Sequence, residues 1–153
     1  MAKWTTKGLT RIIHKNLTLE ESENRNGHAI SKHNAVSKEK LKRRCEEERK
    51  TSTSFHKGEM EDLIIKTLTD SHYRGGNIHF IVEWLNDYSW GDALAIDLYV
   101  GKSTGYGYRY DKSVKSATGL FCNGVTVVIE KLDDFDYVPF YIKTAYPCKI
   151  YEV

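Results

Sequence analysis

The stretch GVTVVIEKLDDFDYVPFYIKTAYP, residues 124–147, contains two segments that are rich in β-branched and aromatic residues. They run from Gly124 to Leu132 and from Pro139 to Pro147, and both predict strands. The acidic DDFDY between them is typical of the tip of an antiparallel hairpin. This hairpin predicts a β-sheet in the C-terminal part of the chain.

Side chains on the second of these strands alternate between its two faces. Alternation puts Phe140 and Ile142 on the same face as Thr144 and Tyr146, with Ala145 on the opposite face. Two apolar residues followed by two hydroxyls predict a strand that leaves the core and enters a polar cleft.

Two further strands are predicted before the hairpin, at Ala93–Gly101 and Gly105–Tyr110. The second lies in GKSTGYGYRY, which lacks the residue order of a phosphate-binding P-loop. We therefore interpret Gly105 and Gly107 as positions where the backbone approaches another segment closely or bends.

Three helices are predicted earlier in the chain, from Ser37 to about Arg49, from about Lys57 to Ser71 and from about Asn77 to Tyr88. Ser37 is suited to cap the first helix, and Trp84 is expected on the flank of the third. The buried stripe of the first helix is predicted to be Val36, Leu41 and Cys45. Helices followed by strands predict an α+β fold, with N-terminal helices packed on a C-terminal antiparallel β-sheet.

Length and composition indicate one folded domain. The chain has 153 residues, of which 40% are hydrophobic, enough to bury about two-thirds of its unfolded surface in a single core. The longest apolar run is too short to span a bilayer, so no membrane anchoring is expected in this fragment. Cys45, Cys122 and Cys148 lack the spacing of a zinc site, and we expect buried thiols, with a Cys122–Cys148 bridge as the alternative.

Charge is distributed unevenly along the chain. Residues 1–50 carry 13 lysines and arginines against seven acidic residues, although the net charge of the whole chain is only +2. A basic first third joined to an acidic remainder favours a polyanionic ligand on one face, and the alternative is a solvated charged helix.

GHAISKHN, residues 27–34, and the following KLKRRC supply residues suited to RNA cleavage. Transesterification needs a base for the 2′-hydroxyl, a proton donor for the leaving oxygen and fixed positive charge near the phosphorane. Histidine, arginine and hydroxyl groups meet these needs, and no metal or other cofactor is required. We expect His33 and Arg44 to meet Thr144 and Tyr146.

The order of these motifs resembles the bacterial RNase A-like toxin domains at the C-termini of contact-dependent growth inhibition proteins and other polymorphic toxins. The resemblance covers about residues 26–148, while residues 1–25 form an N-terminal extension that has no counterpart. We accordingly assign residues 26–153 to the toxin domain. The matching landmarks are Gly27, His28, His33, Arg44, Ser54, Phe55, Trp84, Leu85, Gly105, Gly107, Val127, Val128 and the TAYP of residues 144–147.

This resemblance implies a pancreatic-ribonuclease-like fold without its disulfides and toxic, metal-independent endoribonuclease activity. Its catalytic pattern falls on His33, Arg44, Thr144 and Tyr146. It also implies an RNA substrate and a dedicated immunity protein, which we expect to be acidic. The chain would be the C-terminal part of a larger secreted or cell-surface effector that acts in the target-cell cytoplasm and inhibits bacterial growth.

Other basic and aromatic residues are candidates for secondary roles. His28 is the candidate for a second acid or base group, with the alternative that its ring holds its own loop. The predicted RNA-binding residues are Lys40, Arg43, Lys102, Tyr106 and Arg109.

Two other functions are compatible with the sequence. The first is a non-catalytic RNA-binding module that uses the basic helix and the tyrosine-rich strands. The second is an immunity or scaffold domain that binds another protein. The set of His33, Arg44, Thr144 and Tyr146 favours the ribonuclease, because a binding module has no need of it.

Overall fold

The computed structural model describes residues 4–24, 27, 32–72, 76–87, 91–132 and 138–150. The helices are α1 (Thr6–Asn16), α2 (Leu19–Asn24), α4 (Lys38–Glu48), α5 (Met60–Thr69) and α6 (Gly76–Asn86). The strands are β1 (Ser52–Phe55), β2 (Ala93–Tyr99), β3 (Gly105–Asp111), β4 (Ser116–Cys122), β5 (Gly124–Lys131) and β6 (Phe140–Cys148). Within these ranges, none of the helices is long and apolar enough to cross a membrane.

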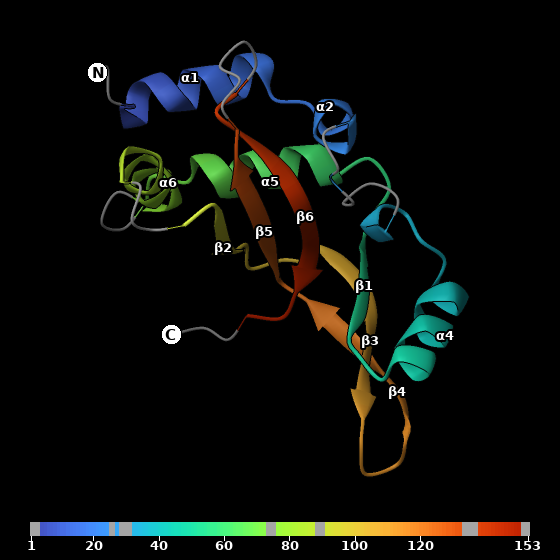
Figure 1. Ribbon diagram of the computed structural model, residues 1–153. Coiled ribbons are helices and arrows are strands. Elements are labelled where there is room, and N and C mark those ends of the chain that lie inside the picture. Colours follow the sequence, from blue (N-terminus) through green and yellow to red (C-terminus); the bar gives the residue numbers. More distant parts are fainter. Residues whose placement is uncertain are drawn as a thin grey trace.

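The strands form two antiparallel three-stranded sheets. The order β2-β5-β6 makes one sheet, here called the core sheet, and β1-β3-β4 makes the other, here called the open sheet. Helices and antiparallel sheets together confirm the α+β prediction, although the sequence pattern predicted one sheet. Figure 1 shows α4 beside β1 of the open sheet, apart from α1, α5 and α6, which lie near the core sheet.

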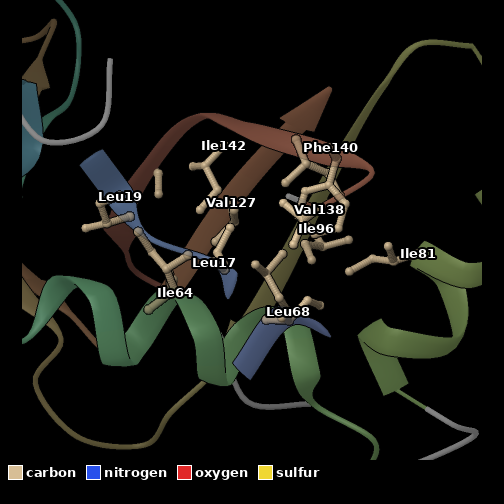
Figure 2. Close-up of a cluster of buried hydrophobic side chains, with 14 of the residues drawn as sticks. Leu17, Leu19, Ile64, Leu68, Ile81, Ile96, Val127, Val138, Phe140 and Ile142 are labelled. Carbon is tan, nitrogen blue, oxygen red and sulfur yellow. The ribbon is translucent and has the colours of Figure 1, made fainter. Parts of the chain in front are cut away.

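The main hydrophobic cluster lies between the core sheet and its helices. Val127 and Ile129 of β5 are fully buried in this cluster, as are Phe140 and Ile142 of β6. Figure 2 shows Ile64 and Leu68 of α5 on one side of the cluster and side chains of the core sheet on the other. Trp84 of α6 is also fully buried, so its predicted place on the helix flank is wrong.

Helices α1 and α2 contribute to the same core. Leu9 and Ile13, one helical turn apart on α1, are fully buried, and Leu17 and Leu19 join them. Ser22 of α2 accepts a hydrogen bond from the backbone of Ile142 on β6 at 3.1 Å. α2 therefore packs against β6 at the edge of the core sheet, whereas α1 packs against α5 and α6.

The open sheet is covered less completely. On β4 only Cys122 is buried, and Phe121 is 59% exposed. Gly105 and Gly107 of β3 face β1 closely, because a Cβ at either would lie 2.2 Å from a β1 carbonyl oxygen. The prediction that these glycines mark a close backbone approach is confirmed.

The hairpin at the end of the chain is also confirmed, since β5 and β6 pair antiparallel. The residues of its predicted tip, 133–137, lie outside the described residues. The three predicted helices correspond to α4, α5 and α6, and Ser37 caps α4 by accepting a hydrogen bond from the backbone of Lys40. α1, β1 and β4 were not predicted, and residues 18–34, which include α2, were expected to form a loop or a short helical turn.

Candidate active site

His33 lies in a short turn that is fastened to β1. The hydroxyl of Ser54, fully buried on β1, donates to the His33 carbonyl at 3.1 Å and accepts from the backbone of Val36 at 2.9 Å. The backbone of Ala35 donates to the Phe55 carbonyl at 3.1 Å. These contacts hold the turn although Ala35 has a left-handed φ of 51°, which is unfavourable for a residue with a side chain.

The His33 imidazole is buried and has a defined tautomer. Its Nδ1 lies 2.8 Å from the carbonyl oxygen of Thr53. Because a carbonyl only accepts, Nδ1 carries the proton and Nε2 of the neutral ring is the basic nitrogen. Burial lowers the pKa of His33, as do the charges of Lys32 and Arg44, whereas the bond to Thr53 opposes this shift. A lowered pKa favours the neutral imidazole near pH 7.

Arg44 is placed by α4 and by the His33 turn together. It is half-buried, one helical turn after the buried Leu41, and its Nη1 donates to the Lys32 carbonyl at 2.9 Å. The neighbouring Arg43 is exposed. The guanidinium is thus held beside His33 while its other N–H groups are available to a ligand.

A β-bulge in β6 aims the two hydroxyl residues at this turn. Val128 pairs with Thr144 and the next residue, Ile129, pairs with Ile142, so one residue of β6 is extra. After the bulge, Ala145 is fully buried in the core, whereas Thr144 and Tyr146 are half-buried. The expectation that Thr144 and Tyr146 share a face with Ile142 is wrong, because the bulge reverses the alternation.

The four predicted catalytic residues line one cavity of about 460 Å³. His33 and Arg44 come from the turn and α4, and Thr144 and Tyr146 come from β6. The rings of His33 and Tyr146 are 5.6 Å apart between centroids. Residues more than a hundred positions apart in the chain therefore meet where the two sheets adjoin.

Thr53 links the two sides of this cavity. Its carbonyl accepts from His33, and its hydroxyl donates to the Pro147 carbonyl at 2.8 Å. Both bonds are buried. A single residue of β1 therefore fixes the imidazole and ties down β6 next to Tyr146.

Tyr146 is suited to act as a donor. Burial is the main cause that raises the pKa of its phenol, with smaller contributions from Cys148 and Asp97, while the Thr126 hydroxyl lowers it. The phenol therefore stays protonated through neutral pH. The Tyr146 phenol and the Thr144 hydroxyl can therefore both donate hydrogen bonds to an anionic oxygen.

Several cavity residues were missed by the sequence analysis. Lys32 and Lys50 add positive charge to the cavity, Glu48 adds negative charge, and Thr53 supplies the link described above. Lys32 immediately precedes His33, so its proximity was a usable signal. No sequence signal indicated the role of Thr53, because that role depends on the approach of β6 to β1.

The remaining predicted site residues are dispersed. His28 lies outside the described residues. Lys40, Arg43 and Lys102 are exposed, and none of them lines the cavity. The Tyr106 hydroxyl donates to the Val36 carbonyl at 2.6 Å. Arg109 lines a neighbouring cavity.

In the described part of the chain, the cysteines and acidic residues form neither a disulfide nor a metal site. Cys45, Cys122 and Cys148 are free thiols, so the alternative of a Cys122–Cys148 bridge is not seen. Burial is the main cause that raises the pKa of Cys122 to about 12, which makes it a poor nucleophile. Among the residues that the structure describes, no cluster of histidine, cysteine and acidic residues could hold a metal ion.

Comparison with known proteins identifies a matching family and a solved structure with a similar fold. Residues 27–147 match the family model of the bacterial CdiA-CT RNase A domain. A solved structure described as the CdiA-CT/CdiI complex from Y. kristensenii 33638 has a TM-score of 0.60 and 19% sequence identity, covering 79% of this chain and 98% of that chain. At this identity the likeness shows a shared fold. No curated protein matches the chain.

The family match spans most of the chain and includes His33, Arg44, Thr144 and Tyr146. The resemblance expected from the sequence motifs is thereby confirmed, and the chain belongs to the bacterial CdiA-CT RNase A domain family.

Proposed function

We propose that the chain is a toxin endoribonuclease that cleaves RNA by metal-independent transesterification in target bacteria. The observation that carries this proposal is the position of His33, whose Nδ1 is bonded to the Thr53 carbonyl in a cavity shared with Arg44, Thr144 and Tyr146. The family to which the chain belongs supports the ribonuclease activity. The cleavage mechanism and the roles below are our proposals.

Nε2 of His33 takes the proton of the ribose 2′-hydroxyl. The 2′-oxygen then forms a bond to phosphorus, and the bond from phosphorus to the 5′-oxygen breaks. The products are a 2′,3′-cyclic phosphate and a strand with a 5′-hydroxyl. The 5′-oxygen receives its proton from water or from His28, which we keep as the candidate for the second acid or base group.

Arg44, Thr144 and Tyr146 stabilise the phosphorane. The guanidinium supplies fixed positive charge and planar donors for phosphate oxygens. The two hydroxyls, which line the same cavity, donate to the same oxygens. Such preorganised donors lower the free energy of the charged transition state more than that of the bound RNA.

Two further proposals concern partners and location. We propose that an acidic immunity protein covers the cavity or the basic helix α4, since opposite charge speeds capture and the similar solved structure is a complex with CdiI. Its association rate should fall as salt rises. We also propose that the chain is the C-terminal part of a larger secreted or cell-surface effector that acts in the target-cell cytoplasm.

The proposed mechanism is tested by incubating the purified protein with 5′-labelled RNA in excess EDTA and analysing the new ends. We expect 2′,3′-cyclic phosphate ends, or the 3′-phosphates formed from them by hydrolysis. Cleavage that requires an added divalent metal would contradict the mechanism. RNA that is bound but left intact would favour the non-catalytic RNA-binding module.

Two variants of His33 make the assignment specific. His33→Ala removes the base, and His33→Asn removes it while keeping an N–H that can reach the Thr53 carbonyl. We expect both to lose about a thousandfold in rate, the range of general acid–base catalysis, while circular dichroism shows a folded protein. Full activity of a folded His33→Asn protein would exclude His33 as the base.

A further inference from the structure

A row of three polar side chains crosses the core sheet and ends at Tyr146. β5 lies between β2 and β6 in this sheet (Figure 1). The register pairs Thr126 of β5 with Tyr146 of β6 on one side and with Asp97 of β2 on the other. Directly paired residues of antiparallel strands point to the same face of a sheet. The row therefore runs from the exposed edge strand to the cavity that contains His33, here called the reaction cavity.

The hydroxyl of Thr126 is the centre of this row. It donates to Asp97 Oδ1 at 2.6 Å, a short hydrogen bond to a carboxylate, and it lies 3.3 Å from Cys148 Sγ. Burial is the main cause that raises the pKa of the Tyr146 phenol, and a hydrogen bond with the Thr126 hydroxyl opposes this shift. Thr126 is only 9% exposed, so water competes little for its hydroxyl.

The outer end of the row is fixed by a helix. The side-chain amide of Asn77, on α6, donates to the backbone carbonyl of Asp97 at 2.9 Å. The same amide donates to a backbone carbonyl of α5 at 2.9 Å. β2 is thus fastened to both helices at the residue whose carboxylate holds Thr126.

The chemistry of hydroxyl groups lets Thr126 stay bonded to the phenol throughout the reaction. A hydroxyl has one proton to donate and two lone pairs that accept. While Thr126 donates to Asp97, its lone pairs can accept the proton of the Tyr146 phenol. When the phenol turns this proton to a phosphate oxygen, the phenol oxygen can accept from Thr126 instead. Thr126 remains its partner in both arrangements, so the phenol oxygen keeps its place.

We propose that Thr126 and Asp97 are positioning residues, which hold the Tyr146 phenol where it donates to the phosphorane. This inference rests on the proposed ribonuclease function. Neither residue lines the reaction cavity, so both act through Tyr146. The groups that determine the reaction rate therefore extend across all three strands of the core sheet.

Substitutions of Thr126 and Asp97 test this proposal on an RNA octamer. Thr126→Val removes the hydroxyl and keeps the shape of the side chain. We expect its kcat to fall about tenfold, the upper range for one hydrogen bond, with little change in KM because the phenol acts on the transition state. Thr126→Ser should recover most of the rate. Asp97→Asn should lose only about threefold, because an amide oxygen still accepts from Thr126.

A second background shows whether the effect passes through the phenol. In Tyr146→Phe the phenol oxygen is absent, so adding Thr126→Val should lower kcat by no more than about twofold. A further tenfold loss in this background would overturn the inference. So would a rise in KM that accounts for the whole effect of Thr126→Val.

Two matched controls separate positioning from stability. Thr104→Val removes another buried hydroxyl, which donates to a backbone carbonyl at 2.7 Å, and Asp92→Asn removes an exposed carboxylate just before β2. Neither residue lines the reaction cavity. Both variants should keep the kcat of the unmodified protein. If Thr104→Val lowers kcat as much as Thr126→Val does, the loss reflects stability and the inference fails.

Carbon-13 NMR keeps the inference testable apart from catalysis. With tyrosine labelled at Cζ, the resonance of Tyr146 is the one that Tyr146→Phe removes. We expect Thr126→Val and Asp97→Asn to shift this resonance, and the two control variants to leave it in place. An unmoved resonance in Thr126→Val would refute the contact with the phenol, whereas failure of the unmodified protein to cleave any RNA would refute only the proposed activity.

Discussion

The two sheets of this molecule differ in what they are packed against. The core sheet buries Val127, Ile129 and Phe140 against three helices, while β4 of the open sheet leaves Phe121 largely exposed. The candidate active site contains residues held by both sheets. Thr144 and Tyr146 lie on the core sheet, and His33 is hydrogen-bonded to β1 of the open sheet. The comparison suggests that the core sheet supplies stability and that the junction of the two sheets supplies function.

The largest effect should come from the core. Phe140→Ala removes a fully buried ring, and we expect it to lower the free energy of unfolding by about 4 kcal/mol. Phe121→Ala, the same change on the open sheet, should change it by about 0.5 kcal/mol or less. Urea denaturation measures both, and equal losses would contradict the contrast between the sheets.

An intermediate effect should follow from the link between the sheets. Thr53→Val removes the hydroxyl that donates to the Pro147 carbonyl while keeping the size of the side chain. We expect kcat on RNA to fall about tenfold with little change in KM, because a small displacement of Tyr146 affects the transition state most. Thr53→Ser should restore most of the lost rate.

Thr104→Val is the matched control for this link. The Thr104 hydroxyl is buried and donates to the Gly124 carbonyl at 2.7 Å, and it lines neither cavity. Both valine variants should lose about 1–3 kcal/mol of stability, the cost of an unsatisfied buried carbonyl. A loss of kcat of the same size in Thr104→Val would show that Thr53 acts through stability alone.

The smallest effect should be a shift in pH dependence. Because the His33 pKa is lowered, the acid limb of the kcat/KM profile should lie below pH 6.5. Lys32→Gln removes one of the charges that lower this pKa, so the limb should move to higher pH. Lys38→Gln, which does not line the reaction cavity, should leave it in place. A limb that moves to lower pH in Lys32→Gln would contradict the assigned electrostatics.

The same pKa shift affects stability. The unfolded chain binds a proton at His33 near the ordinary pKa of 6.5, whereas the folded chain binds it only at lower pH. Below pH 6.5 the unfolded state therefore binds more protons, and stability decreases as the pH falls through the folded-state pKa. His33→Asn should be less sensitive to pH in this range.

Local signals predicted much of the fold. α4 was predicted because Ser37 caps it and Leu41 and Cys45 repeat at helical spacing. The β5–β6 hairpin was predicted from β-branched residues on both sides of a turn. β4 was missed because both of its faces are largely exposed, and β1 because all four of its residues are buried and three are polar.

The N-terminal segment shows another limit of sequence patterns. Leu9 and Ile13 were a usable helical signal, yet residues 1–25 were assigned to an extension of uncertain role. Both residues are part of the main hydrophobic cluster. The boundary between residues 25 and 26 remains a prediction, and the burial of these residues gives the segment a structural contribution.

The candidate site was predicted by residue type and motif, whereas its geometry was not. His33 and Arg44 follow from their spacing, but no pattern near Lys143 reveals the bulge that turns Thr144 and Tyr146 toward them. The link through Thr53 joins positions 94 residues apart. Such contacts depend on how the two sheets pack, which local sequence patterns do not encode.

The most direct test of the central claim is a double-mutant cycle across the junction of the two sheets. It measures kcat/KM on one RNA for the unmodified protein, His33→Ala, Tyr146→Phe and the double variant. If both residues act on one phosphorane, the double variant should lose at least about 1 kcal/mol less transition-state stabilisation than the sum of the single losses. Losses that add to within about 0.5 kcal/mol would show independent residues and would contradict a site assembled from both sheets.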